Sequence, residues 1–130
     1  KEAGLELCSG GIIGMGETIE QRVELGISLQ SLNPDEVPVN MLIGREGTPL
    51  FNKFSLTEEE IIRTIATFRF LMPRAILKIA GGREVHLKKN DKKVLKAGAN
   101  GIISGGYLTT KGNKHQEDIR MLKEIGLKQN

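Results

Sequence analysis

Three side chains of this sequence are candidates for chemistry, and each is associated with a short apolar stretch. Cys8, the single cysteine of the chain, ends the stretch of residues 5–8. A thiolate is the usual protein ligand of an iron–sulfur cluster, although a free cysteine also serves as a small buried hydrophobe. Asn40 lies within an apolar stretch, where its amide needs partners or a ligand to offset burial. Arg83 lies just past another such stretch, and an arginine there usually pairs with a carboxylate.

Glycine-rich segments follow three of the predicted strands, namely Ser9-Gly10-Gly11, Gly81-Gly82 and Gly105-Gly106. Ligands of α/β proteins bind beyond the carboxyl ends of the strands, and glycine lets the backbone approach a ligand closely. Turns and helix caps are the alternative explanation for any one of these segments. Three of them at one end of a sheet favour a binding site. Residues 10–17 also resemble a dinucleotide-binding loop, but they follow no long strand and lack the lysine of a phosphate loop.

Other catalytic and metal-binding patterns are missing from the sequence. His86 and His115 have neither metal-ligand spacing nor a paired ligand, so we interpret both as ordinary surface or loop residues. The sequence contains no CxxC motif, no Ser/His/Asp arrangement and no identifiable catalytic carboxylate pair. The residues alone therefore predict an α/β module with a glycine-lined mouth that contains Cys8, Asn40 and Arg83.

Alternating strands and helices must position these residues, and helix start and stop signals mark several of the boundaries. Thr18 can cap one helix, Thr57 and Glu60 form a capping-box pattern for the next, and Pro73 ends that second helix. Apolar residues recur at helical spacing in residues 18–32, 57–72, 88–97 and 114–125, which predicts four helices. The predicted strands are residues 5–8, 37–43, 75–80 and 101–104.

These elements form four strand–helix units whose strands begin about thirty residues apart, the spacing of βαβ units with a parallel sheet. The apolar character of the strands fits such a sheet, because parallel strands are covered on both faces. Two architectures agree with this order: an open four-stranded sheet, or half of an eight-stranded barrel whose full length is about 250 residues. The length of the chain favours neither.

Composition restricts the class of protein further. The 130 residues suffice for one domain with its own core, and the net charge of +3 comes from 19 basic and 16 acidic residues mixed along the chain. Four Phe and one Tyr are too few for a platform that stacks single-stranded nucleic acid. We interpret the lysine-rich residues 88–96 as a solvated helix face, so we expect no nucleic-acid partner.

Compartment and chain boundaries follow from a few further features. No apolar run approaches the roughly 18 residues of a membrane span, so we expect no membrane partner. A single cysteine excludes an internal disulfide, which favours a reducing cytoplasm. The chain begins at Lys1 without an initiator methionine, and residues 1–5 resemble the end of a helix, so we expect a fragment of a longer protein.

Eight segments of the chain resemble, in the same order, segments of one known enzyme family. Residues 8–18 (CSGGIIGMGET) resemble the family's fifth-strand motif, residues 37–42 (VPVNML) its sixth strand and residues 80–84 (AGGRE) its seventh-strand motif. The remaining matches are residues 47–50 (GTPL), 62–66 (IRTIA), 72–73 (MP), 97–100 (AGAN) and 107–110 (YLTT). These matches extend over nearly the whole chain, and their common order makes them specific. The chain thus resembles the biotin synthase family of radical S-adenosylmethionine enzymes.

The resemblance implies strands five to eight of a (β/α)8 barrel of the TIM type, so that residues 1–130 form its C-terminal half. In the family, a 4Fe–4S cluster in the barrel reductively cleaves S-adenosylmethionine. The resulting 5′-deoxyadenosyl radical abstracts hydrogen from dethiobiotin, and an auxiliary 2Fe–2S cluster donates the sulfur atom of biotin. The barrel positions the clusters and keeps water out.

The same resemblance implies roles for individual residues. Cys8 is expected to ligate the auxiliary cluster together with Arg83, and Asn40 is expected to contact dethiobiotin. The residues expected to flank the adenosyl group of S-adenosylmethionine are Ile12, Gly14, Met41 and Ile43. Ala80 and Gly81 stand where the seventh-strand motif usually has serine and alanine.

Parts of the family site are missing from this sequence. The CxxxCxxC loop that holds the 4Fe–4S cluster is absent, as are the other cysteines of the auxiliary site. We therefore expect the chain to be inactive alone and to need an N-terminal half-barrel, or to self-associate as a homodimer. Two alternatives stay open. One is a related radical enzyme of the type that matures the iron-hydrogenase cofactor, and the other is a non-enzymatic, self-associating half-barrel that serves as a binding module.

Overall fold

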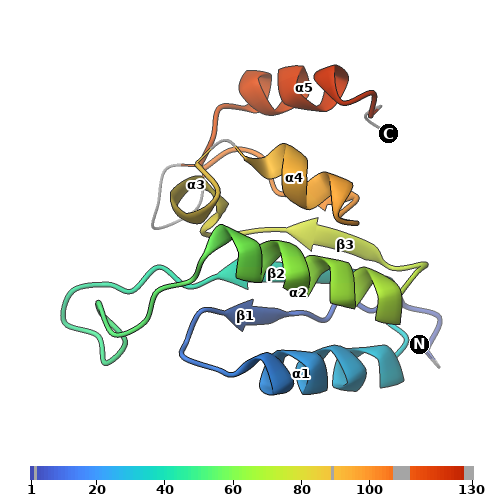
Figure 1. The fold of residues 1–130 in the computed structure, drawn as a ribbon. Helices are drawn as coiled ribbons and strands as arrows, with labels where there is room; N and C mark the ends of the chain where they lie inside the picture. The colour runs from blue at the N-terminus through green and yellow to red at the C-terminus, as the bar shows by residue number, and fades with distance from the viewer. Residues whose placement is uncertain (2, 89, 107–111, 128–130) are drawn as a thin grey trace.

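The computed structural model describes residues 1, 3–88, 90–106 and 112–127, in which strands and helices alternate. In chain order the elements are β1 (Gly11–Ile13), α1 (Ile19–Ser31), β2 (Glu36–Met41), α2 (Glu58–Leu71), β3 (Ile76–Ile79), α3 (Arg83–His86), α4 (Asp91–Lys96), β4 (Gly101–Ile102) and α5 (His115–Glu124). Figure 1 shows α1 and α2 running alongside the strands, while the loop between β2 and α2 projects beyond the strand tips.

The four strands form one parallel sheet in the order β1-β2-β3-β4. Each strand pairs with the next one along the chain, so that Ile12 aligns with Asn40 and Pro38 aligns with Lys78. Consecutive parallel strands joined by helices are the arrangement of a (β/α)8 barrel, whereas a doubly wound open sheet reverses its strand order. The observed order therefore favours the half-barrel.

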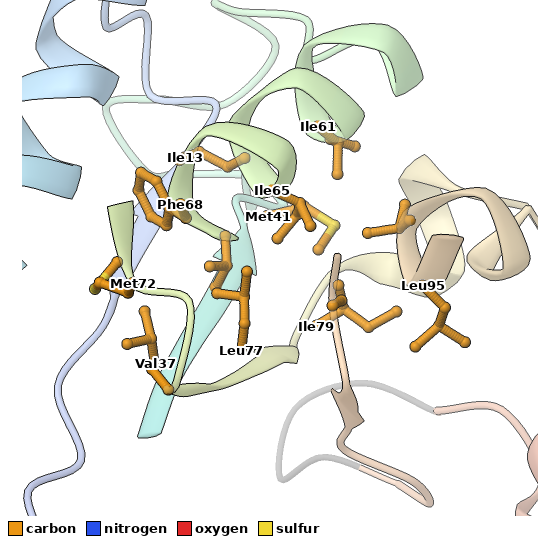
Figure 2. Packing of buried hydrophobic residues seen from close by; sticks show 14 of the residues in the cluster. Ile13, Val37, Met41, Ile61, Ile65, Phe68, Met72, Leu77, Ile79 and Leu95 are labelled. Carbon is orange, nitrogen blue, oxygen red and sulfur yellow. The ribbon is translucent and has the colours of Figure 1, made fainter. Parts of the chain in front are cut away.

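Helix α2 buries its apolar face against the sheet (Figure 2). Ile65 and Phe68 of this helix are buried in the same cluster as Leu77 and Ile79 of β3. On β2, buried positions alternate with partly exposed ones along the whole strand. Full burial of one such side chain stabilises the fold by about 1.5–3 kcal/mol. The hydrophobic core therefore lies between this face of the sheet and the helices that cover it.

The other face of the sheet, which we call the open face, carries the alternate side chains of the strands. Its members are Ile12, Glu36, Pro38, Asn40, Ile76 and Lys78, and none of them is buried. Successive side chains of a strand point to opposite faces, so these six point away from the core side. In a (β/α)8 barrel the helices form the outer ring, which makes the open face the inner one.

Two predicted helix starts are confirmed by their caps. Thr18 accepts a hydrogen bond from the backbone N–H of Gln21 and caps α1, and Thr57 caps α2 through Glu60 in the same way. The side chains of Gln21 and Glu60 in turn accept hydrogen bonds from the backbone N–H groups of the two threonines, which completes a capping box at each start. The partners are three residues apart, so the sequence alone contains the whole motif.

The first strand differs from the prediction. It is β1 rather than residues 5–8, and of the predicted strand only Cys8 pairs, in an isolated parallel bridge with Glu36. A Cβ on Gly10 would lie 1.9 Å from the carbonyl oxygen of Pro38, so this glycine lets two backbones lie close together. The segment 9–11 therefore belongs to the start of the sheet and does not follow a strand.

The helix predicted for residues 88–97 is shorter and is preceded by a second helix. The chain forms α3 shortly after β3, from Arg83, and begins α4 only at Asp91. Between them Lys88 has a φ of +45°, a left-handed value that a right-handed helix does not contain. The prediction missed α3 because four residues show no helical period.

None of the helices in the described ranges combines the length and the apolar character needed to cross a membrane. The longest of them, α2, has 14 residues, whereas a membrane-spanning helix needs about 20 apolar residues.

Candidate functional site

Cys8 lies at the amino end of the open face, beside an ion pair. Its backbone bridges to Glu36, the first residue of β2, so its exposed side chain shares a face with that carboxylate. The ammonium group of Lys78 on β3 lies 2.5 Å from Oε2 of Glu36. One thiol, one carboxylate and one ammonium group are thus collected at this end of the sheet.

Glu36 and Lys78 are candidates that the sequence patterns did not reveal. The apolar character of residues 75–80 predicts a strand buried on both faces, in which a lysine has no place. The signal lay in the alternation, because Leu77 and Ile79 on either side of Lys78 are the buried positions. A charge between two buried positions indicates a strand that leaves one face uncovered.

Arg83 is fully buried at the start of α3 and is held by two carboxylates. Its Nη1 lies 2.8 Å from Oδ1 of Asp91 on α4, and its Nη2 lies 2.6 Å from Oδ2 of Asp118 on α5. Burial alone lowers the pKa of Arg83, but the hydrogen bonds and charges of Asp118 and Asp91 outweigh it and raise the pKa above its ordinary value. The guanidinium is therefore charged, and both of its terminal nitrogens are held in ion pairs.

The structure does not bring Arg83 to Cys8. Cys8 aligns with the first residue of β2, whereas Arg83 comes after the carboxyl end of β3, so the two lie at opposite ends of the sheet. The physical reason is the pair of carboxylates on α4 and α5, which draws the arginine to the helices. This geometry does not support the prediction that Cys8 and Arg83 ligate one cluster together.

Asn40 lies on the open face, in register with Ile12 of β1. Its Oδ1 accepts a hydrogen bond from the backbone N–H of Gly81 at 3.0 Å, which fixes the orientation of the amide. Within the described ranges its Nδ2 has no partner, so this donor is available to a ligand. Sequence reasoning expected partners or a ligand here, and the structure provides one partner.

The four residues predicted to flank an adenosyl group divide into two kinds. Ile12 is exposed on the open face, and Ile43 is partly exposed just past the end of β2. Gly14 is buried, and the side chain of Met41 belongs to the core. The backbone N–H of Met41 donates to the carbonyl of Gly81 at 2.7 Å. Only Ile12 and Ile43 can therefore present side chains to a ligand.

A carboxylate clamps the loop that joins β1 to α1. Glu17 accepts hydrogen bonds from the backbone N–H groups of Gly14 (2.7 Å) and Met15 (2.6 Å). The Nε of Arg22 donates to the same carboxylate at 2.7 Å, and this arginine also pairs with Glu60 at the start of α2. Burial alone raises the pKa of Glu17, but the hydrogen bonds from Gly14, Arg22 and Met15 outweigh it and keep the pKa below its ordinary value.

We expect Glu17→Gln to destabilise the protein by about 1.5–3 kcal/mol at pH 7, because hydrogen bonds to a charged group contribute about that much. A carboxyl group whose pKa is lower in the folded state stabilises the fold above its unfolded pKa, which is about 4.3 for glutamate. That contribution disappears as pH falls through the folded pKa, so below about pH 4 the parent loses more stability than the variant. Urea unfolding at pH 7 and pH 3 measures both effects.

The matched control for this variant is Glu46→Gln, since Glu46 is exposed on the loop after β2. We expect its unfolding to follow that of the parent at both pH values. A Glu17→Gln variant with the parent's stability at pH 7 would show that the clamp contributes little.

Residues 38–128 match the model of the Biotin and Thiamin Synthesis associated domain family. The chain belongs to this family. The matched residues contain most of β2, then β3, β4 and the helices between and after them, together with Asn40 and Arg83. Cys8 and the clamped loop after β1 precede the matched residues.

Two relatives of this biotin and thiamin synthesis associated domain are named biotin synthase. The chain is 51% identical over 128 residues to the biotin synthase of Nitrosopumilus maritimus, with 98% of the chain and 39% of the relative covered. It is 52% identical over 128 residues to that of Clostridium perfringens strain 13, with 98% and 40% covered. The chain thus spans about two fifths of the length of these relatives and corresponds to their C-terminal portion.

The solved structure of methylornithine synthase shares the fold of the domain. It matches with a TM-score of 0.71 at 22% identity, and the match covers 99% of this chain and 42% of that chain. At this level of identity the likeness concerns the fold alone. It confirms the predicted α/β class, in which four βα units form the C-terminal half of a (β/α)8 barrel.

The domain fits one part of an iron–sulfur site. Cys8 is a free, exposed thiol on the face that is the inner one in a barrel. Among the residues that the structure describes, no three His, Cys, Asp or Glu side chains are grouped so that they could hold a metal ion. Cys8 can therefore supply one thiolate, and the sequence contains no second cysteine to supply another. The family-like segment 107–110 lies outside the described residues.

Proposed function

We propose that this chain is the C-terminal part of a biotin synthase, a radical S-adenosylmethionine enzyme that inserts sulfur into dethiobiotin. The observation that carries the proposal is the 51% identity to the biotin synthase of Nitrosopumilus maritimus over 98% of the chain. The name shared by the relatives favours this function over a maturase of the iron-hydrogenase cofactor and over a binding module without activity.

In the proposed enzyme the open face lines the barrel interior, where Cys8 ligates the auxiliary 2Fe–2S cluster. Lys78 and Glu36 form the ion pair beside this thiol, because Cys8 bridges to Glu36. The bound cofactors supply the radical and the sulfur atom, and the 4Fe–4S cluster belongs to the N-terminal half-barrel. The contribution of this chain is one thiolate and part of the pocket wall.

Asn40 contacts dethiobiotin in this proposal, through the Nδ2 group that is left after Gly81 has engaged Oδ1. Ile12 and Ile43 contact the adenosyl group of S-adenosylmethionine with apolar side chains, and the buried Gly14 and Met41 shape the backbone beneath them. We assign Arg83 the role of an anchor for α3, because the carboxylates of Asp91 and Asp118 already hold both of its terminal nitrogens.

The partner of this chain is the rest of the barrel. The open face presents the exposed apolar side chains of Ile12 and Ile76, and the strands β1 and β4 are the two ends of the described sheet. Uncovered apolar surface and unpaired strand edges favour association. We propose that the N-terminal half-barrel covers them, and that the chain alone self-associates as a homodimer.

Complementation tests the proposal. The chain is grafted in place of the corresponding C-terminal part of the Nitrosopumilus maritimus biotin synthase and expressed in a bacterium that lacks its own biotin synthase. We expect growth on dethiobiotin without biotin. Cys8→Ser in the graft is expected to reduce growth to that of the empty vector, because the cluster loses a thiolate ligand.

Ser28→Ala is the matched control, since Ser28 is an exposed residue of α1 on the helix side. We expect this variant to grow like the parent graft. A soluble graft that does not support growth would contradict the proposed function. Full growth of the Cys8→Ser graft would instead contradict the role of Cys8 while leaving the function in place.

A further inference from the structure

The loop between β2 and α2 reaches across to the loop between β1 and α1. Figure 1 shows the first of these loops projecting beyond the strand tips before it returns to α2. On this return, Leu56 lies over Gly14 and Phe54 lies over Gly16. The two loops are therefore in contact at the carboxyl end of the sheet, where ligands of barrel proteins bind.

Both contacts depend on glycine. Gly14 and Gly16 have φ values of +92° and +93°, in the region that only glycine adopts without strain. A Cβ on Gly14 would lie 3.1 Å from Cδ2 of Leu56, and a Cβ on Gly16 would lie 2.4 Å from Cε1 of Phe54. The Phe54 ring thus rests directly on the backbone of the loop after β1.

The two apolar side chains differ in what they contribute. Leu56 is buried in the core, so the fold itself requires it. Phe54 is 50% exposed and adds little to that core, yet its ring covers a backbone segment at the proposed cofactor site. We expect this half-exposed ring to help fix the position of the loop after β1, because it packs against the loop backbone at Gly16.

The loop that Phe54 covers is also held by Glu17, which accepts hydrogen bonds from the N–H groups of Gly14 and Met15. This loop follows β1, the strand that carries Ile12, an exposed side chain of the open face. We propose that Phe54 is a positioning residue for S-adenosylmethionine, an inference that rests on the proposed function. Its ring holds the loop after β1 in the conformation that flanks the adenosyl group.

The test uses the full-length graft described above and S-adenosylmethionine as the probe. Loss of the ring in Phe54→Ala is expected to raise the KM for S-adenosylmethionine about fivefold to tenfold. A change of this size is what the loss of one apolar contact produces in an affinity. The kcat is expected to stay within about twofold, because the ring touches no reacting group. Phe54→Leu keeps an apolar cover and is expected to restore much of the affinity.

A second measurement reports on the loop without reference to activity. Hydrogen exchange of the amides of Gly14 and Met15 is expected to be faster in Phe54→Ala than in the parent graft. Phe70→Ala is the matched control, because Phe70 is 88% exposed on α2 and lies outside both loops. We expect it to change neither the KM nor the exchange of these amides.

The outcomes separate this inference from the proposed function. A parent graft without S-adenosylmethionine-dependent activity counts against the proposed function, and unchanged amide exchange in Phe54→Ala then also removes the role of the ring in holding the loop. An active parent graft whose KM for S-adenosylmethionine is unchanged by Phe54→Ala overturns the inference and leaves the proposed function intact.

Discussion

Replacing Arg83 by methionine is expected to lower the free energy of unfolding by about 3–5 kcal/mol, the usual cost of leaving a buried charge without its partner. In the parent, Arg83 is fully buried and pairs with Asp91 and Asp118, each of which is only 3% exposed. Methionine fills much of the volume of the arginine but leaves two carboxylates without a cation. Urea unfolding at pH 7 measures the difference.

The control is an arginine whose ion pair is exposed. Arg63 pairs with Glu59 one helical turn away on α2, and the two side chains are 71% and 70% exposed. Such a pair contributes about 0.3–0.5 kcal/mol, so Arg63→Met is expected to have little effect. Equal losses in both variants would contradict the structural role of Arg83. Arg83→Lys keeps the charge but cannot bridge two carboxylates, and we expect a loss between those of the other two variants.

This network also has a consequence for the site. Arg83 joins α4 and α5 to the residues directly after Gly81, and the N–H of Gly81 orients the amide of Asn40. The last helix of the chain therefore helps to position a predicted substrate contact on β2. A variant that releases α5, such as Asp118→Asn, acts on the pocket through this chain of contacts.

The parts of this fold that depend on neighbours in sequence could be predicted from the sequence. Thr18 and Thr57 each find their capping partner three residues away, and the helices that they start end within one residue of the predicted limits. Pro73 ends a helix because of its own ring. Such signals need no knowledge of the tertiary structure.

The parts that depend on distant residues could not be predicted. The carboxylates that hold Arg83 are 8 and 35 residues away in the chain, so the residue type alone could not distinguish an anchor from a metal ligand. Cys8 was expected to end a strand at the glycine-lined mouth, but its bridge to Glu36 places it at the amino end of the sheet. The role of Lys78 depends on the same register.

The glycines of the predicted mouth raise a last question, namely whether they serve a ligand or the backbone itself. Gly82 has a φ of +91°, and a Cβ on it would lie 2.0 Å from the carbonyl oxygen of Met41. We expect Gly82→Ala to cost more than about 3 kcal/mol, because the left-handed conformation alone costs about 1–2 kcal/mol and the clash with a backbone atom of β2 adds to it. Urea unfolding measures the loss.

Gly47→Ala separates the two contributions. Gly47 has a φ of +81° on the loop after β2, but a Cβ there would meet no atom within 4 Å, so its loss is limited to the conformational cost of about 1–2 kcal/mol. If Gly82 instead served close approach of a ligand, its alanine variant would unfold like Gly47→Ala and lose only activity. A clearly larger loss of stability at Gly82 assigns this glycine to the contact between β2 and the turn after β3. The binding contribution of this end of the sheet then belongs to Asn40 and the loops around it.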